Sequence, residues 1–225
     1  MYFSSGQVQS LMEELRESAR AAEKHVLAEA QKALGFRPEV TVADAPPVEA
    51  ILSAVGDLDI DLVVMGTHGR GGVQRLWLGS VAERVIRLSP RPVMAIRHSW
   101  PQTGLGSILC PVSCSDAGFQ AFEYAAATAK AEGARLLVLH STESTQLPAE
   151  FRATCDRVRA HSELEEMVVR GEPAKEILEA AHRRSPDLVI MGAERRVTAM
   201  GEIFSSTTER VMRHTVAPIL VVPRW

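Results

Sequence analysis

Hydrophobic residues along this chain follow two alternating spacings. Short apolar runs with the length of buried strands alternate with longer stretches in which apolar residues recur every three or four positions, as on one face of a helix. The predicted strands are 39–42, 62–65, 93–96, 107–112, 135–140, 165–169, 187–192 and 219–222, and the predicted helices are 8–34, 47–56, 80–88, 116–131, 148–160 and 173–183. This alternation predicts an α/β fold built on parallel sheets with right-handed crossovers.

The second half of the chain repeats the first at one ungapped shift. Gly66 and Gly192 are 126 positions apart, and the same shift relates Pro47 to Pro173, Ile51 to Ile177, Asp61 to Asp187, Met65 to Met191, Ser80 to Ser206, Glu83 to Glu209, Arg87 to Arg213 and Pro92 to Pro218. Such agreement indicates an internal duplication. A turn-rich stretch separates the two parts, so we expect a first domain at 1–100 (the first repeat), a linker at 101–106 and a second domain at 107–225 (the second repeat).

The stretch 61–80 carries the clearest chemical signal. An apolar run ends at Gly66, glycine recurs at positions 69, 71, 72 and 79, and a helical pattern opens at Ser80. Glycine permits positive φ and close approach of the backbone to a ligand, and a helix N-terminus offers free N–H groups. A strand, a glycine loop and a helix start in this order predict a cradle for an anion such as phosphate. A tight strand-to-helix turn without any ligand is the structural alternative.

The loop differs from two better-known phosphate loops. No Gly-Lys-Ser or Gly-Lys-Thr follows it, and Gln74 stands where a dinucleotide fingerprint needs a third glycine. The spacing Gly66-x2-Gly69-x9-Gly79-Ser80 instead resembles the nucleotide-binding signature of the universal stress protein family. The resemblance implies two tandem Rossmann-like, adenine nucleotide alpha hydrolase-like units that bind ATP, with or without Mg, in a regulatory role.

The same resemblance implies the residues around the nucleotide, with Met65 near the adenine and the glycines and Ser80 around ribose and phosphates. The implied set is Met65, Gly66, Thr67, Gly69, Arg70, Gly79, Ser80 and Val81. Arg70 resembles a family position whose guanidinium reaches phosphate oxygens, although a solvated loop arginine explains it equally well. The Ser80 hydroxyl is expected either to bind phosphate or to cap the helix.

The second repeat departs from this signature. Arg195 replaces Gly69, Ser205 replaces Gly79 and Glu202 is added, so the backbone is held away from a phosphate and a carboxylate opposes it. In the family an aspartate ends the first strand beside the ribose, and this chain has Ser113 there. We therefore expect no nucleotide in the second domain.

The first repeat keeps the glycine signature but lacks its opening elements, because its counterpart of residues 107–140 would precede Met1. In the family strand order 3-2-1-4-5 the missing strands lie in the middle, so we expect a half-sheet with exposed edges. We interpret this as the loss of about forty-five upstream residues or as strands supplied by a partner chain. The resemblance also implies that the last strands, 93–96 and 219–222, pair edge to edge within the chain, and it allows a homodimer.

Composition and charge narrow the range of binding partners that we expect. A net charge of -3 and a pI near 6.2 give no electrostatic reason to expect nucleic acid or an anionic membrane. No segment approaches the roughly 18 apolar residues of a membrane span. Cys110, Cys114 and Cys155 are too few for a disulfide framework and predict free thiols in a cytoplasmic protein.

No catalytic or metal-binding pattern accompanies the glycine loop. The chain lacks a Ser-His-Asp order, a His-Glu-x-x-His helix and paired carboxylates beside the loop, so we predict no enzyme beyond slow ATP hydrolysis. Regulatory nucleotide binding is the first hypothesis. A scaffold that binds no nucleotide is the alternative, and an adenylate-transferring enzyme is a third that lacks the expected Ser-Gly-Gly-x-Asp loop.

Overall fold

The computed structural model describes residues 5–67, 78–97, 104–142, 149–193, 195–198 and 201–224 and divides the chain into two compact units, Met1–Pro46 and Pro47–Trp225. The first unit contains one long helix, α1 (Ser5–Leu34), as the helical periodicity predicts. Gly35 follows it at φ 73°, a left-handed conformation that favours glycine, and its N–H donates to the Gln31 carbonyl oxygen at 3.0 Å.

The predicted strand at 39–42 is wrong. These residues belong to no strand, and the side chain of Val42 is exposed. Alternation of apolar and polar residues predicts a strand only where a neighbouring strand can accept its backbone hydrogen bonds. No strand is found within the described part of the first unit, residues 5–46, so residues 39–42 have no strand there to pair with.

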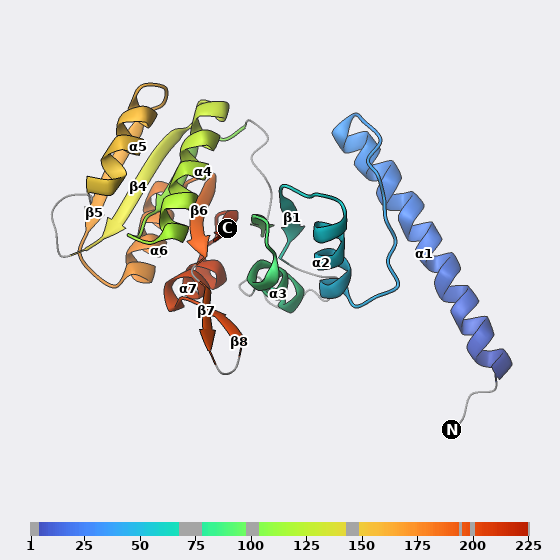
Figure 1. The fold of residues 1–225 in the computed structure, drawn as a ribbon. Helices are drawn as coiled ribbons and strands as arrows, with labels where there is room; N and C mark the ends of the chain where they lie inside the picture. The colour runs from blue at the N-terminus through green and yellow to red at the C-terminus, as the bar shows by residue number, and fades with distance from the viewer. Residues whose placement is uncertain are drawn as a thin grey trace. The chain divides into compact units, whose positions relative to one another are not determined.

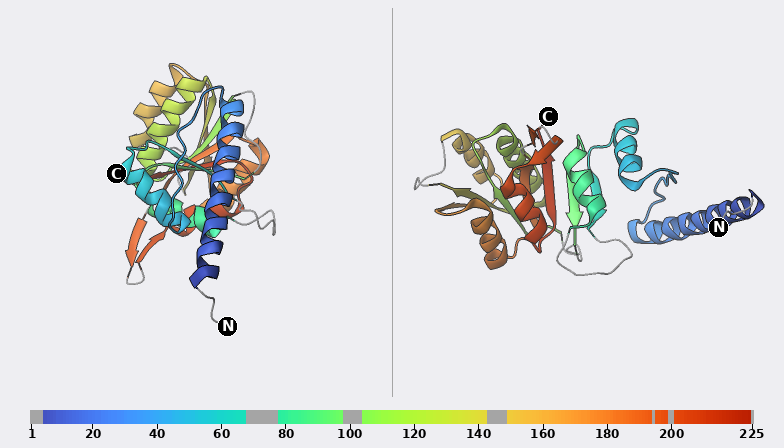
Figure 2. Two further views of the ribbon diagram at one scale, coloured as in Figure 1. Left: turned by 90° about the vertical axis from the view of Figure 1, so that its right-hand side faces the viewer. Right: turned by 90° about the horizontal axis from the view of Figure 1, so that it is seen from below.

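The second unit is a mostly parallel sheet with helices on both faces (Figures 1 and 2). Its elements are α2 (Pro47–Asp57), β1 (Val63–Gly66), α3 (Ser80–Leu88), β2 (Val93–Ile96), β3 (Ser107–Pro111), α4 (Asp116–Glu132), β4 (Arg135–Ser141), α5 (Ala149–Arg159), β5 (Leu164–Val169), α6 (Pro173–Arg184), β6 (Leu188–Ala193), β7 (Arg195–Thr198), β8 (Gly201–Phe204), α7 (Ser206–His214) and β9 (Ile219–Pro223). The main sheet has the order β1-β2-β9-β6-β3-β4-β5, while β7 and β8 form a separate hairpin. The α/β fold and its parallel strands are therefore confirmed.

One antiparallel contact joins the two repeats. The last strands of the repeats, β2 and β9, pair with each other in the register Val93 to Val221, Met94 to Leu220 and Ala95 to Ile219. Met94 and Leu220 are themselves related by the 126-residue shift, so a local two-fold axis passes through this pair. The junction thus pairs equivalent residues of the two repeats.

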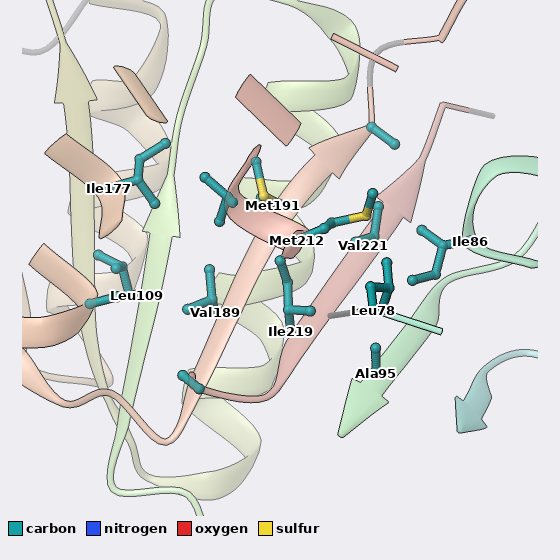
Figure 3. Close-up of a cluster of buried hydrophobic side chains, with 14 of the residues drawn as sticks. Leu78, Ile86, Ala95, Leu109, Ile177, Val189, Met191, Met212, Ile219 and Val221 are labelled. Atoms are coloured by element: carbon teal, nitrogen blue, oxygen red, sulfur yellow. The ribbon is translucent and has the colours of Figure 1, made fainter. Parts of the chain in front are cut away.

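A single apolar cluster extends across this junction (Figure 3). Ile86 of α3 and Ala95 of β2 lie in the same cluster as Met212 of α7 and Val221 of β9, and all four are at most 2% exposed. The core therefore holds both repeats together from residue 47 onward, and the chain divides into two compact units after Pro46.

Four charged side chains bridge α3 and α7 beside the same axis. Arg87 lies 2.8 Å from Glu83 on its own helix and 3.4 Å from Glu209 on the other. Arg213 lies 3.1 Å from Glu83 and 3.0 Å from Glu209. Because Glu83 and Arg87 are equivalent to Glu209 and Arg213 by the shift, the four form a closed, pseudo-symmetric ion-pair ring.

In addition, the Arg97 guanidinium donates to the Arg213 carbonyl oxygen at 2.8 Å and so caps the end of α7.

Two equivalent glycines have very different surroundings. A Cβ atom added at Gly192 of β6 would lie 2.2 Å from the carbonyl oxygen of Ala117, at the start of α4. A Cβ added at Gly66 of β1 would meet no atom of the described residues within 4 Å. The packing of α4 onto β6 therefore requires glycine at 192, while no described contact requires it at 66.

We expect Gly192→Ala to destabilise the protein by about 2–3 kcal/mol, because the start of α4 must move away from β6 to admit the methyl group. Gly66→Ala should change the free energy of unfolding by less than about 1 kcal/mol. Urea unfolding followed by circular dichroism measures both. Equal losses in the two variants would contradict the account of these positions.

The ion-pair ring should make stability depend on pH. Burial raises the pKa of Glu83, but hydrogen bonds and charge from Arg87 and Arg213 outweigh it and leave this pKa below its ordinary value of 4.5. A lowered pKa in the folded state adds stability that is present above pH 4.5 and is lost as the pH falls through the lowered value. Glu83→Gln should cost on the order of 1 kcal/mol at pH 7 and flatten the acid limb of the stability profile. The control Glu14→Gln, an exposed position on α1, should leave that limb unchanged.

Candidate functional site

A well-formed cavity lies in the second repeat, at the carboxyl ends of its parallel strands. It is a cavity of about 770 Å³ between the ends of β3, β4 and β6. Strand order reverses between β3 and β6, and such switch points are where open parallel sheets bind ligands. The lining residues are Pro111, Val112, Ser113, Cys114, Gly118, Leu139, His140, Ser141, Thr142, Pro173, Ile177, Met191, Gly192, Ser205, Ser206, Thr207, Thr208 and Glu209.

Three helices, α4, α6 and α7, begin beside this cavity. The Ser115 side chain accepts from the Gly118 N–H at 3.1 Å and caps α4, and the Ser205 side chain accepts from the Thr208 N–H at 3.3 Å and caps α7. The Glu172 carboxylate caps α6. Helix N-termini carry partial positive charge, so their convergence favours an anionic group in the cavity.

Hydroxyl groups supply most of the polar side chains of the lining. Ser113 lies at the position of the expected aspartate, with its Oγ 3.0 Å from Ser115 Oγ. Thr208 Oγ1 donates to the Gly192 carbonyl oxygen at 3.3 Å, which ties the start of α7 to the end of β6. Among the described lining residues, Glu209 is the only carboxylate and no lysine or arginine is present. The cavity can thus offer backbone N–H groups and hydroxyls to a ligand.

His140 and the three thiols complete the chemistry around the cavity. His140 is buried, and its Nδ1 lies 3.0 Å from the Val112 carbonyl oxygen. Cys114 is exposed at the cavity, whereas Cys110 and Cys155 are buried in the apolar core. Burial raises the pKa of the Cys110 thiol far above its ordinary value and raises the pKa of Cys155 to about 11. Cys114 is therefore the reactive thiol of the described residues.

The residues predicted around the nucleotide in the first repeat fall into two groups. Gly69 and Arg70 lie outside the described residues. The others lie at the carboxyl end of β1 and the start of α3, where the Gly79 N–H donates to the Thr67 carbonyl oxygen at 2.9 Å. These six residues are Met65, Gly66, Thr67, Gly79, Ser80 and Val81, and the fold brings them to one edge of the sheet.

Two expectations about these residues are wrong in detail. Gly79 has φ −62°, and Gly66 is not among the described positive-φ residues, so neither uses the left-handed freedom of glycine. Gly79 is required for another reason, since a Cβ there would lie 2.6 Å from the Thr67 carbonyl oxygen. Ser80 does not cap α3: Gly79 holds the cap position without a side-chain hydrogen bond, and Ser80 is the first helical residue.

Two features of the second repeat were not predicted from the sequence. The segment between β6 and α7 forms the β7–β8 hairpin, paired from Arg195 with Phe204 to Thr198 with Gly201. The sequence feature that could have predicted this hairpin is the presence of β-branched residues on both sides of Gly201. The comparison of glycines predicted a lost ligand site, yet the structure places a ligand-sized cavity beside the start of α7. The cavity is formed in part by the ends of β3 and β4, and the spacing of glycines in a loop carries no information about those strands.

Known proteins resemble this chain in sequence and in fold. The profile described as "Universal stress protein family" matches residues 2–97 and 150–223. A universal stress protein of Thermus aquaticus is 41% identical over 86 residues, which are 38% of this chain and 62% of that relative. One of Mycolicibacterium smegmatis is 26% identical over 226 residues, covering 88% of this chain and 76% of its own length. The chain spans little more than half the length of the next two curated relatives, 54% and 55%.

A solved structure supports the same relationship. The crystal structure of a universal stress protein from Archaeoglobus fulgidus superimposes with a TM-score of 0.81 at 25% identity and covers 100% of this chain and 84% of that one. Within the described residues, no helix is long and apolar enough to cross a membrane. The family profile, the relatives and the fold together lead to one conclusion: this chain belongs to the universal stress protein family.

Proposed function

We propose that this protein binds an adenine nucleotide as a regulatory ligand, and that the nucleotide occupies the cavity of the second repeat. The position of the cavity carries the proposal, because it lies at the switch point between β3 and β6. Its volume of about 770 Å³ falls in the range of roughly 300–1,000 Å³ of small-molecule pockets. Proteins of this family are generally regulatory rather than enzymatic, which favours a signalling role over turnover.

The lining residues fit the parts of a nucleotide. Phosphate oxygens would accept from backbone N–H groups at the start of α7 and from the hydroxyls of Ser206 and Thr207. The Ser113 hydroxyl, in place of a carboxylate, would make a neutral hydrogen bond with the sugar. Ile177 and Met191 offer apolar contact for a base. With ATP bound, the phosphates would supply negative charge and a place for Mg.

The glycine loop of the first repeat is proposed as a second phosphate site. Its described residues, Met65 to Thr67 and Gly79 to Val81, lie at the carboxyl end of β1. However, β1 is the outer strand of the sheet, and no described strand stands beside it to hold the rest of a nucleotide. We therefore expect this loop to bind more weakly than the cavity of the second repeat.

A scaffold that binds no nucleotide is the alternative function. The carboxylate of Glu209 among the lining residues favours it, because a carboxylate beside phosphates raises the electrostatic cost of binding. In the structure this charge is paired with Arg87 and Arg213, which lowers the cost. For this reason nucleotide binding is the better-supported function.

Titration with Mg-ATP in a calorimeter tests the proposal at the α7 cap. Ser205→Asp should weaken binding at least about tenfold, because aspartate caps a helix as well as serine but places a negative charge beside the phosphates. Ser205→Asn is the matched control, since it caps equally without charge and should bind as the wild type does. Gly69→Arg should leave the main binding heat unchanged. No heat in the wild type would favour the scaffold, and loss of heat in Gly69→Arg alone would move the site to the first repeat.

Thiol labelling gives a second, independent readout. At pH 8 a disulfide reagent should modify Cys114 quickly and leave Cys110 and Cys155 unmodified, because burial raises the pKa of both buried thiols. Saturating Mg-ATP should slow the modification of Cys114 by about tenfold if it fills the cavity beside this side chain. Mass spectrometry after labelling assigns the site. An unchanged rate with bound nucleotide would place the nucleotide elsewhere.

A further inference from the structure

A hollow of about 400 Å³ lies between the carboxyl-terminal turns of α6 and α7, in the second repeat. Both helices begin at the cavity proposed for the nucleotide, so this hollow lies at their opposite ends. His182 follows Pro173 by nine positions on α6, which is about 14 Å along a helix. We call this hollow the α6–α7 pocket, and its described lining residues are Leu178, Ala181, His182, Arg210, His214, Thr215 and Val216.

The Thr215 hydroxyl is buried at this pocket without a partner. Thr215 is 2% exposed, and its Oγ1 has no hydrogen-bond partner among the described residues. Its backbone N–H ends α7 by donating to the Val211 carbonyl oxygen at 2.9 Å, so the main-chain donor is satisfied and the side chain is not. A buried hydroxyl without a partner raises the free energy of the folded protein, and a ligand that hydrogen-bonds to it removes that cost.

The equivalent hydroxyl of the first repeat is satisfied. Ser89 stands 126 positions before Thr215, also caps the end of its helix and is 0% exposed. Its Oγ donates to the Arg91 carbonyl oxygen at 2.8 Å and accepts from the Arg91 N–H at 3.1 Å. This position of the fold can therefore satisfy its own hydroxyl, and the second repeat leaves it available to a ligand.

Both imidazoles of the pocket are specific to the second repeat. At the 126-residue shift the counterpart of His182 is Gly56. The counterpart of His214 is Leu88. Two rings that can donate or accept hydrogen bonds thus stand where the first repeat has no such side chains. The second repeat has gained polar groups at the same place where its Thr215 hydroxyl is unpartnered.

The charges around the pocket favour an anion over a metal ion. One guanidinium nitrogen of Arg210 pairs with the Glu172 carboxylate at 2.7 Å, and the planar group has further N–H donors for a second acceptor. Carbonyl oxygens at a helix end carry partial negative charge, but those of Met212 and Arg213 accept from the Arg97 guanidinium. The described residues contain no group of three side chains that could hold a metal.

The rest of the lining is apolar and sets the kind of anion. Leu178 is half-buried, Ala181 is buried, and Val216 is 60% exposed just after α7. Such side chains favour a ligand with an apolar body. Because the Arg210 guanidinium is already shared with Glu172, a singly charged head group fits better than a doubly charged one.

We propose that the α6–α7 pocket binds the carboxylate of a small organic acid that has an apolar body. The carboxylate oxygens would accept from the Thr215 hydroxyl and the Arg210 guanidinium, with the imidazoles of His182 and His214 beside them. The apolar body would cover the aliphatic part of the lining. The protein would then take two different ligands, one at each end of α6 and α7.

The test uses the full chain with hexanoate as the probe, followed by the NMR signals of backbone amides and imidazoles at constant pH. Hexanoate should shift the signals of Thr215, His182 and His214 with a dissociation constant on the order of 1 mM, as expected for so small a ligand. The uncharged analogue hexanamide should bind at least about tenfold more weakly, because it offers no anion to Arg210.

Variants separate binding from folding. Thr215→Val keeps the volume and removes the hydroxyl, so it should weaken hexanoate binding about tenfold and leave the melting temperature unchanged or higher. Ser89→Ala, at the equivalent position, is the matched control and should lower the melting temperature without changing binding. Arg210→Gln should also weaken binding about tenfold, whereas Arg183→Gln, at an exposed arginine of α6 outside the pocket lining, should not.

Three results would overturn the proposal. The first is no shift of these signals at about 20 mM hexanoate. The second is equal binding in Thr215→Val, which would show that the hydroxyl takes no part. The third is hexanamide or inorganic phosphate that binds as tightly as hexanoate, which would exclude recognition of a carboxylate. Ser205→Asp, which tests the nucleotide cavity, should leave hexanoate binding unchanged, so the two proposals can fail independently.

Discussion

The antiparallel pairing of β2 with β9 is the constraint on which the second unit depends. It sets Met94 against Leu220 on a local two-fold axis, and this register brings α3 and α7 together. Their contact then allows Glu83 and Arg87 to meet Glu209 and Arg213 in a closed ring. The same pairing lets Ile86 and Met212 share one apolar cluster, so a short strand contact organises both the charges and the core.

The set of strands present on each side of that axis determines whether a repeat can enclose a ligand cavity. In the second repeat β3 stands between β6 and β4, so three strand ends and three helix starts enclose a cavity. In the first repeat the loop after β1 keeps its glycine spacing, but β1 is the last strand of the sheet among the described residues. A glycine loop suited to phosphate is thus not sufficient for a nucleotide pocket, because the pocket also needs neighbouring strands.

Sequence periodicity predicted most elements of the fold because the helices and buried strands have strong, regular apolar patterns, and the 126-residue shift predicted which of them are equivalent. The prediction failed at 39–42, where no described strand pairs with the segment. It also missed the β7–β8 hairpin between Gly192 and Ser206, because that stretch was compared with the first repeat only for its glycines. The candidate site was harder to predict. Spacing identified the loop at Gly66 to Ser80 but could not report that the cavity is built by Ser113, His140 and Ser205 from distant parts of the chain.

The position of the junction in the strand order also has an evolutionary consequence. Neighbouring strands are about 4.8 Å apart, so the three spacings from β6 to β1 put roughly 14 Å of sheet between β6, beside the cavity, and β1. Substitutions at this distance without shared partners have nearly additive effects. After the duplication, each end of the sheet could therefore accumulate changes under its own selection while the pairing at Met94 and Leu220 kept the fold intact.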